Sequence, residues 1–259
     1  MPGRGQPPSY LALAEAFVRE STETKSEGEL TSLLEAIARE MGFRYYALIH
    51  HDDLRLARPD RIDLKDYPAA ITDRLFGQCR FRGDPVFRGC LYADKAFAWS
   101  GLGSIIQLDA QDRASFEFGM REGLNEGITV PRIMIGECMA SCTFAGTNCP
   151  EMVERYVGVA EIIGAFAFNA ARRLLGQAYP KPAPRLHLQP RARDCVVLAG
   201  RGCSNKEIAR ELGITPRTVD GYMTLARELF EAHDRTELVI SAILAGQVGL
   251  EEVKASRTE

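Results

Sequence analysis

The chain has 259 residues, which is enough for one large domain or two domains of unequal size. Hydrophobic residues make up 46% and charged residues 26% of it, so a hydrophobic core can form and wholesale disorder is excluded. The formal charge of −3 excludes a uniformly basic surface. Any binding to nucleic acid must therefore come from a local group of residues.

No stretch approaches the roughly 18 uninterrupted apolar residues of a membrane span, and the first residues lack the apolar middle region of a secretory signal. We therefore expect a cytoplasmic protein without membrane association. The 7 cysteines are an odd number and lie mostly in apolar stretches. This favours buried thiols in a reducing compartment over a disulfide framework.

Hydrophobic periodicity predicts the elements of the N-terminal part. Apolar residues recur at helical spacing over 11–17 and 30–41, whereas 45–49 is typical of a strand and 51–66 of a loop. Tyr67-Pro68 begins a helix expected to reach about residue 78. Further on, the same rules predict a helix, two strands joined by a turn and a long apolar helix, at residues 109–123, 127–135, 137–146 and 150–175.

Composition divides the chain into two domains and a linker. Helices around antiparallel strands indicate an α+β fold for residues 9–176. Prolines alternate with other residues over 179–184, which is typical of a semi-rigid spacer, and we place a linker at 177–186. Everything that follows has helical character, so residues 187–250 are expected to form a small all-α domain.

The segment 204–219 has the sequence pattern of a helix-turn-helix. Ser204 can cap a first helix, and Gly213 can supply the left-handed residue that ends it. Thr215 can cap a second helix that has Pro216 at its first position. An ordinary helical hairpin would not need all of these features together. We therefore predict a DNA-binding module.

Strings at Leu188–Arg191, Gly202, Ser204–Ala209, Leu212–Ile214 and Arg217–Val219 resemble the LuxR-type (GerE-like) DNA-binding domain over residues 186–250. The resemblance implies four helices, the third in the major groove of double-stranded DNA and the fourth in a dimer contact. It implies phosphate contacts from one group of residues, namely Ser204, Lys206, Thr215, Arg217 and Thr218. It implies base-edge contacts from another group, namely Asp220, Thr224 and Arg227.

Asp220 departs from this pattern, because the family has a lysine there and an aspartate repels phosphate. Residues 185–217 hold seven basic and three acidic residues, net +4, whereas 218–259 hold four basic and eight acidic residues, net −4. The positive surface is therefore narrow. We expect weaker DNA affinity or an unusual operator, with loss of DNA binding in favour of protein contacts as the alternative.

Two kinds of sensor were candidates for the N-terminal domain. A phospho-receiver alternates strands and helices and has an acidic pair at the end of its first strand. Asp52-Asp53 follows a predicted strand, but about 40 residues of helix precede that strand and the alternation is missing. A ligand-binding domain is therefore the better prediction.

The strings Tyr67-Pro68, Asp84-Pro85-Val86, Trp99-Ser100-Gly101 and Gly127–Pro131 resemble the autoinducer-binding domain of LuxR-type quorum-sensing regulators. The resemblance runs from about residue 15 to the C-terminus, and implies an α-β-α sandwich with an antiparallel sheet. It also implies a buried N-acyl-homoserine lactone. The implied ligand-binding positions are Tyr67, Ile71, Leu75, Asp84, Pro85, Trp99, Gly127, Thr129 and Thr143.

Asp84 is the most informative of these positions. A carboxylate in an apolar cavity needs hydrogen bonds, and an amide N–H of the ligand is a good donor. The simpler interpretation is a loop aspartate that caps local backbone ahead of Pro85. Tyr67 would donate its hydroxyl to a ligand carbonyl and Trp99 would form an aromatic wall, with core packing as the alternative for both.

The remaining positions have weaker assignments. Thr129 and Thr143 could bind the acyl carbonyl through a hydroxyl or a water, and Gly127 permits a close backbone approach. The family has Trp and Tyr where this chain has Ile71 and Leu75, neither of which can donate a hydrogen bond. The lost donor to the lactone carbonyl is expected to cost about 1–3 kcal/mol.

Three ligand states therefore stay open: a lactone held by other donors, a different amide-bearing or aromatic molecule, and a pocket filled by its own side chains. We favour an acyl-homoserine lactone or a close relative, because Asp84 still requires an amide. The alternative is a LuxR-type regulator that responds to a non-lactone ligand or acts without one.

Enzymatic and metal-binding functions have little support. None of the four histidines has a catalytic signature. The His50-His51 pair beside Asp52-Asp53 resembles a metal site, but its place at a strand end suggests solvent exposure. We expect a ligand-responsive transcription factor with no enzymatic activity, metal or cofactor. It should be a homodimer on a two-fold operator, with 150–175 as the sensor-domain interface.

Overall fold

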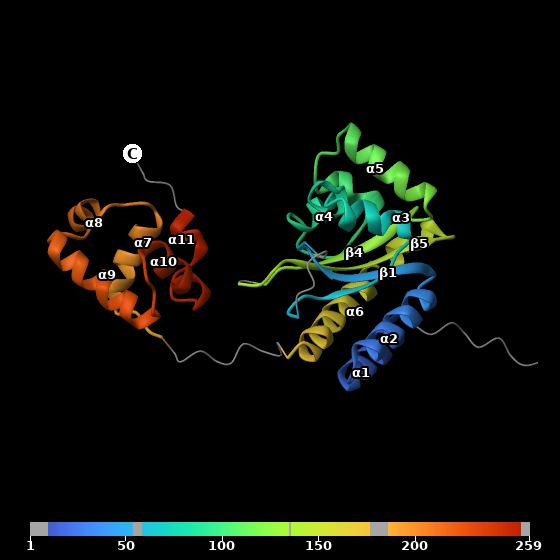
Figure 1. Cartoon of the computed structure of the whole chain (residues 1–259), viewed down its shortest axis with the longest axis horizontal. Helices are drawn as coiled ribbons and strands as arrows, with labels where there is room; N and C mark the ends of the chain where they lie inside the picture. The colour runs from blue at the N-terminus through green and yellow to red at the C-terminus, as the bar shows by residue number, and fades with distance from the viewer. Residues whose placement is uncertain (1–9, 54–58, 135, 177–185, 255–259) are drawn as a thin grey trace, which may run out of the picture. The chain divides into compact units, whose positions relative to one another are not determined.

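The computed structural model describes residues 10–53, 59–134, 136–176 and 186–254. The chain forms two compact units, residues 1–179 and 180–259 (Figure 1). Residues 177–185 of the predicted linker lie outside the described residues.

The first unit is built on an antiparallel sheet of five strands with the order β2-β1-β5-β4-β3. The central strand β5 pairs with β1 and β4, and all of its residues are buried. A strand that is buried along its whole length must be covered on both faces. The strands are β1 (Phe43–His50), β2 (Asp63–Asp66), β3 (Phe97–Ala98), β4 (Gly127–Arg132) and β5 (Ala140–Thr147).

Helices cover both faces of this sheet (Figure 1). On one face lie α1 (Tyr10–Glu23), α2 (Glu27–Glu40) and α6 (Val153–Leu174). Their apolar sides form the main core with the strands, in which the largest fully buried side chains include Phe17, Phe144 and Phe168. The other face carries α3 (Ala69–Thr72), α4 (Pro85–Cys90) and α5 (Ala110–Arg121). The predicted α-β-α sandwich with an antiparallel sheet is confirmed.

An ion pair joins two helices of the second layer. Asp109 and Asp112 form a capping box at the start of α5. Arg88 of α4 donates from one nitrogen to both oxygens of Asp112, at 2.7 and 2.8 Å. Asp112 is 1% exposed, so its charge requires this cation. The pair therefore fixes α4 against α5.

Several predicted boundaries were wrong. Residues 63–66, expected in a loop, form the edge strand β2, which buries only Leu64 and so has little hydrophobic signal. The strands predicted at 127–135 and 137–146 extend too far toward each other. In the structure β4 ends at Arg132 and β5 begins at Ala140.

The predicted helix at 68–78 also has an irregular form. It divides into α3 and a π-helical turn at Asp73–Gly77, in which the Gln78 N–H bonds to the Asp73 carbonyl at 2.8 Å. Such wide turns are frequent at functional sites. The long helix predicted from residue 150 begins with a 3-10 turn at Pro150–Met152, before α6.

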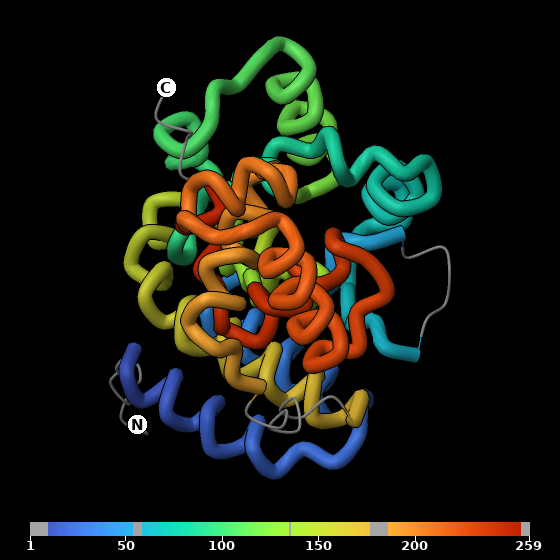
Figure 2. The backbone as a smooth tube through the Cα atoms, turned by 90° about the vertical axis from the view of Figure 1, so that its left-hand side faces the viewer, coloured from blue at the N-terminus to red at the C-terminus, as the bar shows by residue number. Residues whose placement is uncertain are grey.

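Every element in the described part of the second unit is a helix. Its helices are α7 (Pro190–Gly200), α8 (Asn205–Leu212), α9 (Pro216–Phe230), α10 (Arg235–Leu244) and a short α11 (Leu250–Lys254), drawn in orange to red in Figure 2. Ile208, Val219 and Leu238 are fully buried at the centre of its core. The first four helices form the predicted helix-turn-helix domain. Within the described ranges of both units, no helix combines the length and apolarity of a membrane span.

Gly164 gives a test of the packing between α6 and the sheet. A Cβ at this position would lie 2.9 Å from the Val130 side chain, whereas Gly28 on α2 has open space. We expect Gly164→Ala to lower the free energy of unfolding by about 1–3 kcal/mol. Gly28→Ala should leave it unchanged or slightly higher, because alanine favours a helix.

Urea unfolding of the full chain measures both effects. The single Trp of the sequence, Trp99, lies in the first unit, so tryptophan fluorescence follows that unit alone. Equal midpoints for the two variants would contradict the proposed close contact between α6 and β4.

Candidate functional site

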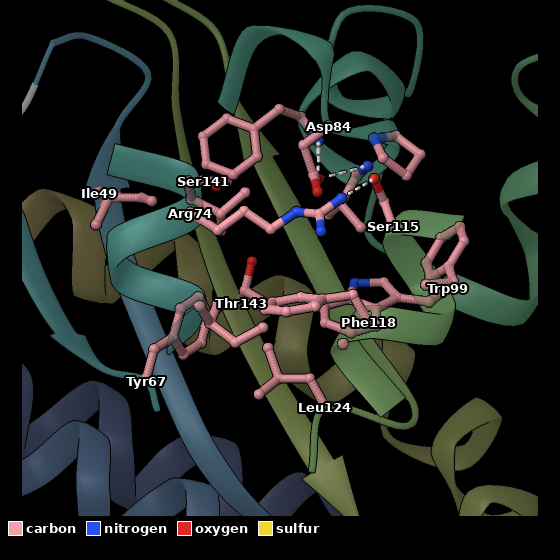
Figure 3. A pocket seen from close by; sticks show the side chains of 17 residues that line it. Ile49, Tyr67, Arg74, Asp84, Trp99, Ser115, Phe118, Leu124, Ser141 and Thr143 are labelled. Carbon is pink, nitrogen blue, oxygen red and sulfur yellow. Dashed lines mark hydrogen bonds between the residues drawn. The ribbon is translucent and has the colours of Figure 1, made fainter. Parts of the chain in front are cut away.

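A cavity of about 60 Å³ lies between the sheet and the second helical layer (Figure 3). Strand residues Ile49, Ser141 and Thr143 contribute to its lining, together with side chains from the segments around α3, α4 and α5. A drug-sized ligand needs a larger space, so its binding requires lining side chains to move. All of the predicted ligand-site residues except Gly127 and Thr129 line this cavity.

Asp84 caps a helix and also lines the cavity. It is the N-cap of α4, and its Oδ1 accepts from the backbone N–H of Val86 at 3.0 Å and of Phe87 at 3.4 Å. Both bonds end on Oδ1, and the carboxylate also lines the cavity (Figure 3). Burial raises the pKa of Asp84 to about 6, although these backbone bonds and the Arg74 guanidinium oppose the shift.

Hydrogen bonds connect Trp99 to two threonine hydroxyls on the sheet. The Trp99 Nε1–H donates to Thr129 Oγ1 at 2.9 Å, and Thr129 Oγ1 lies 3.0 Å from Thr143 Oγ1. The indole N–H can only donate, so Thr129 Oγ1 accepts from it and can donate its own proton to Thr143 Oγ1. Tyr67 and Thr143 both line the cavity, and burial raises the pKa of Tyr67 although the nearby Thr143 hydroxyl lowers it. Tyr67 therefore keeps its proton and can donate it.

Gly127 and Thr129 act behind the cavity wall. Thr129 is fully buried and holds the Trp99 ring through its hydroxyl. A Cβ at Gly127 would lie 2.9 Å from the same ring and 2.8 Å from the Phe144 carbonyl oxygen. The close approach expected at Gly127 is thus made by Trp99. Both residues position an aromatic wall rather than line the space.

Ile71 and Leu75 give one side of the cavity an apolar surface. Ile71 is 5% exposed and packs in a cluster with Leu124 and Ala145, and Leu75 packs against that cluster. Neither side chain has a hydrogen-bond donor. Pro85, the first residue of α4, completes the wall beside Asp84.

Sequence reasoning missed Arg74, which crosses the cavity in Figure 3. Its Nη2 donates to Ser115 Oγ on α5 at 3.2 Å, and its guanidinium lies 4.5 Å from the centre of the Phe118 ring. The available signal was its position three residues after Ile71, which is on the same face of a helix. Ser115 and Phe118 lie on α5, far from the recognised strings.

The expectation of a solvent-exposed histidine pair was wrong. His50 is 2% exposed and its Nδ1 accepts from the Ile62 backbone N–H at 2.9 Å. His51 Nε2 lies 2.9 Å from Ser141 Oγ. Burial lowers the pKa of His50 to about 4 and of His51 to about 3, so both are neutral at pH 7. Within the described parts of the chain, no three His, Cys, Asp or Glu residues are placed to hold a metal.

The second unit contains the helix-turn-helix with the predicted caps. Ser204 and Glu207 form a capping box at the start of α8, and Gly213 ends this helix with a φ of 65°. Thr215 caps α9 by accepting from the Thr218 N–H at 3.1 Å. The hydroxyls of Thr215 and Thr218 also bond to each other at 2.8 Å.

The exposed side of α9 contains both signs of charge. Arg217 and Asp220 are exposed, as is Lys206 on α8, whereas Arg227 is half-buried and donates to Thr224 Oγ1 at 3.3 Å. The opposite side of α9 is buried against the core. Asp220 therefore lies on the outward face of the helix, close to the cations expected to contact phosphate.

Comparison with known families assigns a family to each of the two units. Residues 26–174 match the family described as "Autoinducer binding domain", and residues 187–242 match "Bacterial regulatory proteins, luxR family". The first match alone covers more than half of the chain. The chain belongs to the LuxR family. It is a ligand-binding transcriptional regulator that acts on DNA through its helix-turn-helix domain, and regulators of this family are not enzymes.

LuxR-family relatives match both units. The transcriptional activator protein AnoR of Acinetobacter nosocomialis is 22% identical over 235 residues, which cover 86% of this chain and 93% of AnoR. The crystal structure of Escherichia coli SdiA is 16% identical, covers 92% of this chain and 98% of SdiA, and has a TM-score of 0.57. The CepR2 structure from Burkholderia cenocepacia is 14% identical over 64% of this chain and 98% of CepR2, with a TM-score of 0.52. Both structural matches support the fold.

The raised pKa of Asp84 predicts a pH-dependent stability. The folded state holds the Asp84 proton up to about pH 6, whereas the unfolded carboxyl loses it near the ordinary value of 3.8. The folded state thus binds more protons between these values, and its free energy of unfolding falls as the pH rises. An asparagine side chain does not titrate, so the Asp84→Asn variant lacks this fall in the free energy of unfolding. We expect the stability of the variant relative to the parent to rise by about 1–3 kcal/mol from pH 4 to 7.

Urea unfolding followed by Trp99 fluorescence at each pH measures this difference. Asp109→Asn is the matched control, because the pKa of this N-cap carboxyl is lowered by the Asp112 backbone N–H. The control should show no such gain. A stability difference for Asp84→Asn that is constant with pH would show that the buried carboxyl has an ordinary pKa.

Reversing the charge at position 220 should increase the affinity for DNA. Asp220→Lys should replace repulsion by attraction and tighten binding to a mixed-sequence duplex by about tenfold at low salt. The slope of log affinity against log salt should steepen by about 1. Glu228→Lys makes the same charge change on α9 two turns further on. Fluorescence anisotropy that shows equal gains for the two variants would place Asp220 away from the DNA.

Proposed function

We propose that this LuxR-family regulator binds an N-acyl-homoserine lactone, or a closely related amide, in the cavity of its first unit. The observation that supports the proposal best is the Asp84 carboxylate. It faces an otherwise largely apolar cavity while both of its backbone bonds end on one oxygen. No hydrogen bond among the described residues ends on the second oxygen, Oδ2, and a ligand amide N–H is a good donor for it.

Two further groups suit an acyl amide. Tyr67 keeps its proton and can donate to the acyl carbonyl, and Thr143 supports it from the sheet. Trp99, held by Thr129, provides a flat aromatic wall for the ligand. CepR2, whose structure has the same fold, is described as dependent on N-acylhomoserine lactone.

A non-lactone ligand is the second candidate. Ile71 and Leu75 line the cavity without donors where the family has Trp and Tyr. A second SdiA structure, with a TM-score of 0.54, is described as a complex with octanoyl-rac-glycerol. That ligand is an ester and has no amide N–H for a carboxylate. A regulator that acts without ligand is the remaining alternative.

We further infer that the regulator is a cytoplasmic homodimer on a two-fold operator. Most of α6 packs against α1 and the sheet, which makes the predicted interface narrower than 150–175. A strip of Gly158, Ile162 and Asn169 stays exposed, and Ile162 is 38% exposed. Gly158 permits a close approach and Ile162 offers apolar surface, and this strip could pack against the same strip of a second copy, with Glu154 and Arg155 exposed at its N-terminal end. The phosphate and base contacts assigned to α8 and α9 are part of this proposal.

Mass spectrometry tests the ligand directly. The full chain is expressed with a panel of acyl-, aryl- and branched-chain homoserine lactones, and purified protein is measured intact and after organic extraction. We expect one lactone retained per protomer. Asp84→Asn should lose it, because the amide would then face an amide donor in place of a carboxylate.

Asp109→Asn is again the matched control, since it changes an N-cap aspartate of the same unit that does not line the cavity. It should retain the lactone. Folded protein that retains no lactone, or that retains octanoyl-glycerol in preference, would replace the first proposal by the second candidate.

A further inference from the structure

The donor that the family places at Ile71 is absent from this chain, yet a charged side chain enters the same cavity one helical turn later. We propose that Arg74 is the specificity-determining donor of this site, and that its guanidinium binds the ring carbonyl of a neutral acyl-amide ligand. This inference rests on the proposed function and names the head group that the ligand must carry.

The helix geometry directs Arg74 into the cavity. Ile71, Arg74 and Leu75 all line it, as residues at i, i+3 and i+4 of one helix face do. Arg74 lies in the π-helical turn at Asp73–Gly77, a wider turn than that of an α-helix. Arg74 is therefore placed by the same short segment that lacks the usual donors.

The Arg74 guanidinium has donors to spare. It carries five N–H groups. Among the described residues it makes one hydrogen bond, to Ser115 Oγ at 3.2 Å, and it lies over the Phe118 ring. A weak bond to a hydroxyl can be exchanged for a charge-assisted bond to a carbonyl at little cost. Arg74 can thus shift within the cavity and bind a ligand.

Other donors near this end of the cavity are committed or absent. The Trp99 N–H is bonded to Thr129 at 2.9 Å, so it is not available to a ligand without breaking that bond. Ile71 and Leu75 have no donor. The Tyr67 hydroxyl, which also lines the cavity, is assigned to the acyl carbonyl. Arg74 is the charged donor that is left for a second carbonyl, beside the neutral Ser115 hydroxyl that accepts one of its bonds.

The charges indicate that the ligand is neutral. The Arg74 cation interacts with the Asp84 carboxylate. Asp112, the other carboxylate that acts on Asp84, is already paired with Arg88. The cavity therefore holds one cation and one anion. A neutral ligand with an N–H for Asp84 and a carbonyl for Arg74 satisfies both, whereas an anionic ligand would leave a net buried charge.

A pair of matched ligands tests the role of Arg74. N-acyl-homoserine lactones are compared with N-cyclopentyl amides of the same short, medium and long acyl chains, which keep the amide and lack the ring carbonyl. Affinities are measured by quenching of Trp99 fluorescence. The parent should favour the lactone by about 10- to 100-fold. In Arg74→Met this ratio should fall to about one, because the carbonyl loses its donor.

Arg80→Met is the matched control, since Arg80 is exposed and does not line the cavity. It should keep the parental ratio. If Arg74→Met does not fold, Arg74→Lys replaces it, and its single ammonium should lower the ratio several-fold. Unfolding midpoints confirm that the variants compared are folded.

Each outcome separates this inference from the proposed function. If the parent binds neither amide, both fail. If the parent binds them and Arg74→Met keeps the parental ratio, the amide site stands and the role of Arg74 is overturned. Tighter binding of the ring-opened N-acyl-homoserine, which carries a carboxylate, would overturn the neutral head group.

Discussion

The Asp84 carboxylate starts α4 with one oxygen and lines the cavity of the first unit, so helix capping and the proposed ligand recognition depend on one side chain. Because its backbone bonds fix the carboxylate, its position is set before any ligand arrives. The ion pair between Arg88 and Asp112 then holds α4 against α5. In this way the cavity wall and its acceptor are built together.

The other polar groups of the cavity are ordered around that acceptor. Trp99, Thr129 and Thr143 form one line of hydrogen bonds from the wall to the sheet, which ends at Thr143 in the cavity lining. Such a line leaves a defined donor at one end. Arg74 supplies a donor from the helical layer that faces the sheet across the cavity, where it bonds to Ser115 of α5. An amide with two carbonyl groups suits this arrangement, because each of its polar atoms meets a partner of the opposite kind.

The sequence was most informative where the signal is local. The caps at Ser204 and Thr215 and the left-handed Gly213 follow from residue chemistry alone, and the structure has all three. Long-range geometry was not predictable in the same way. His50 is buried because Ile62, just before β2, bonds to its ring and Phe168 of α6 packs against it. These contacts are distant in the sequence, and the edge strand β2, with one buried residue, has almost no periodicity. Arg74 was missed because its role depends on a π-helical turn and on the distant α5.

A crystal structure of the chain with a bound homoserine lactone would test the central claim most directly, namely that Asp84 and Arg74 together recognise the ligand. We expect the ligand amide nitrogen within about 3.2 Å of an Asp84 oxygen and an Arg74 nitrogen at a similar distance from the ring carbonyl oxygen. A lactone bound outside the cavity would contradict the account. So would a ring carbonyl bonded to Trp99 while Arg74 points to solvent.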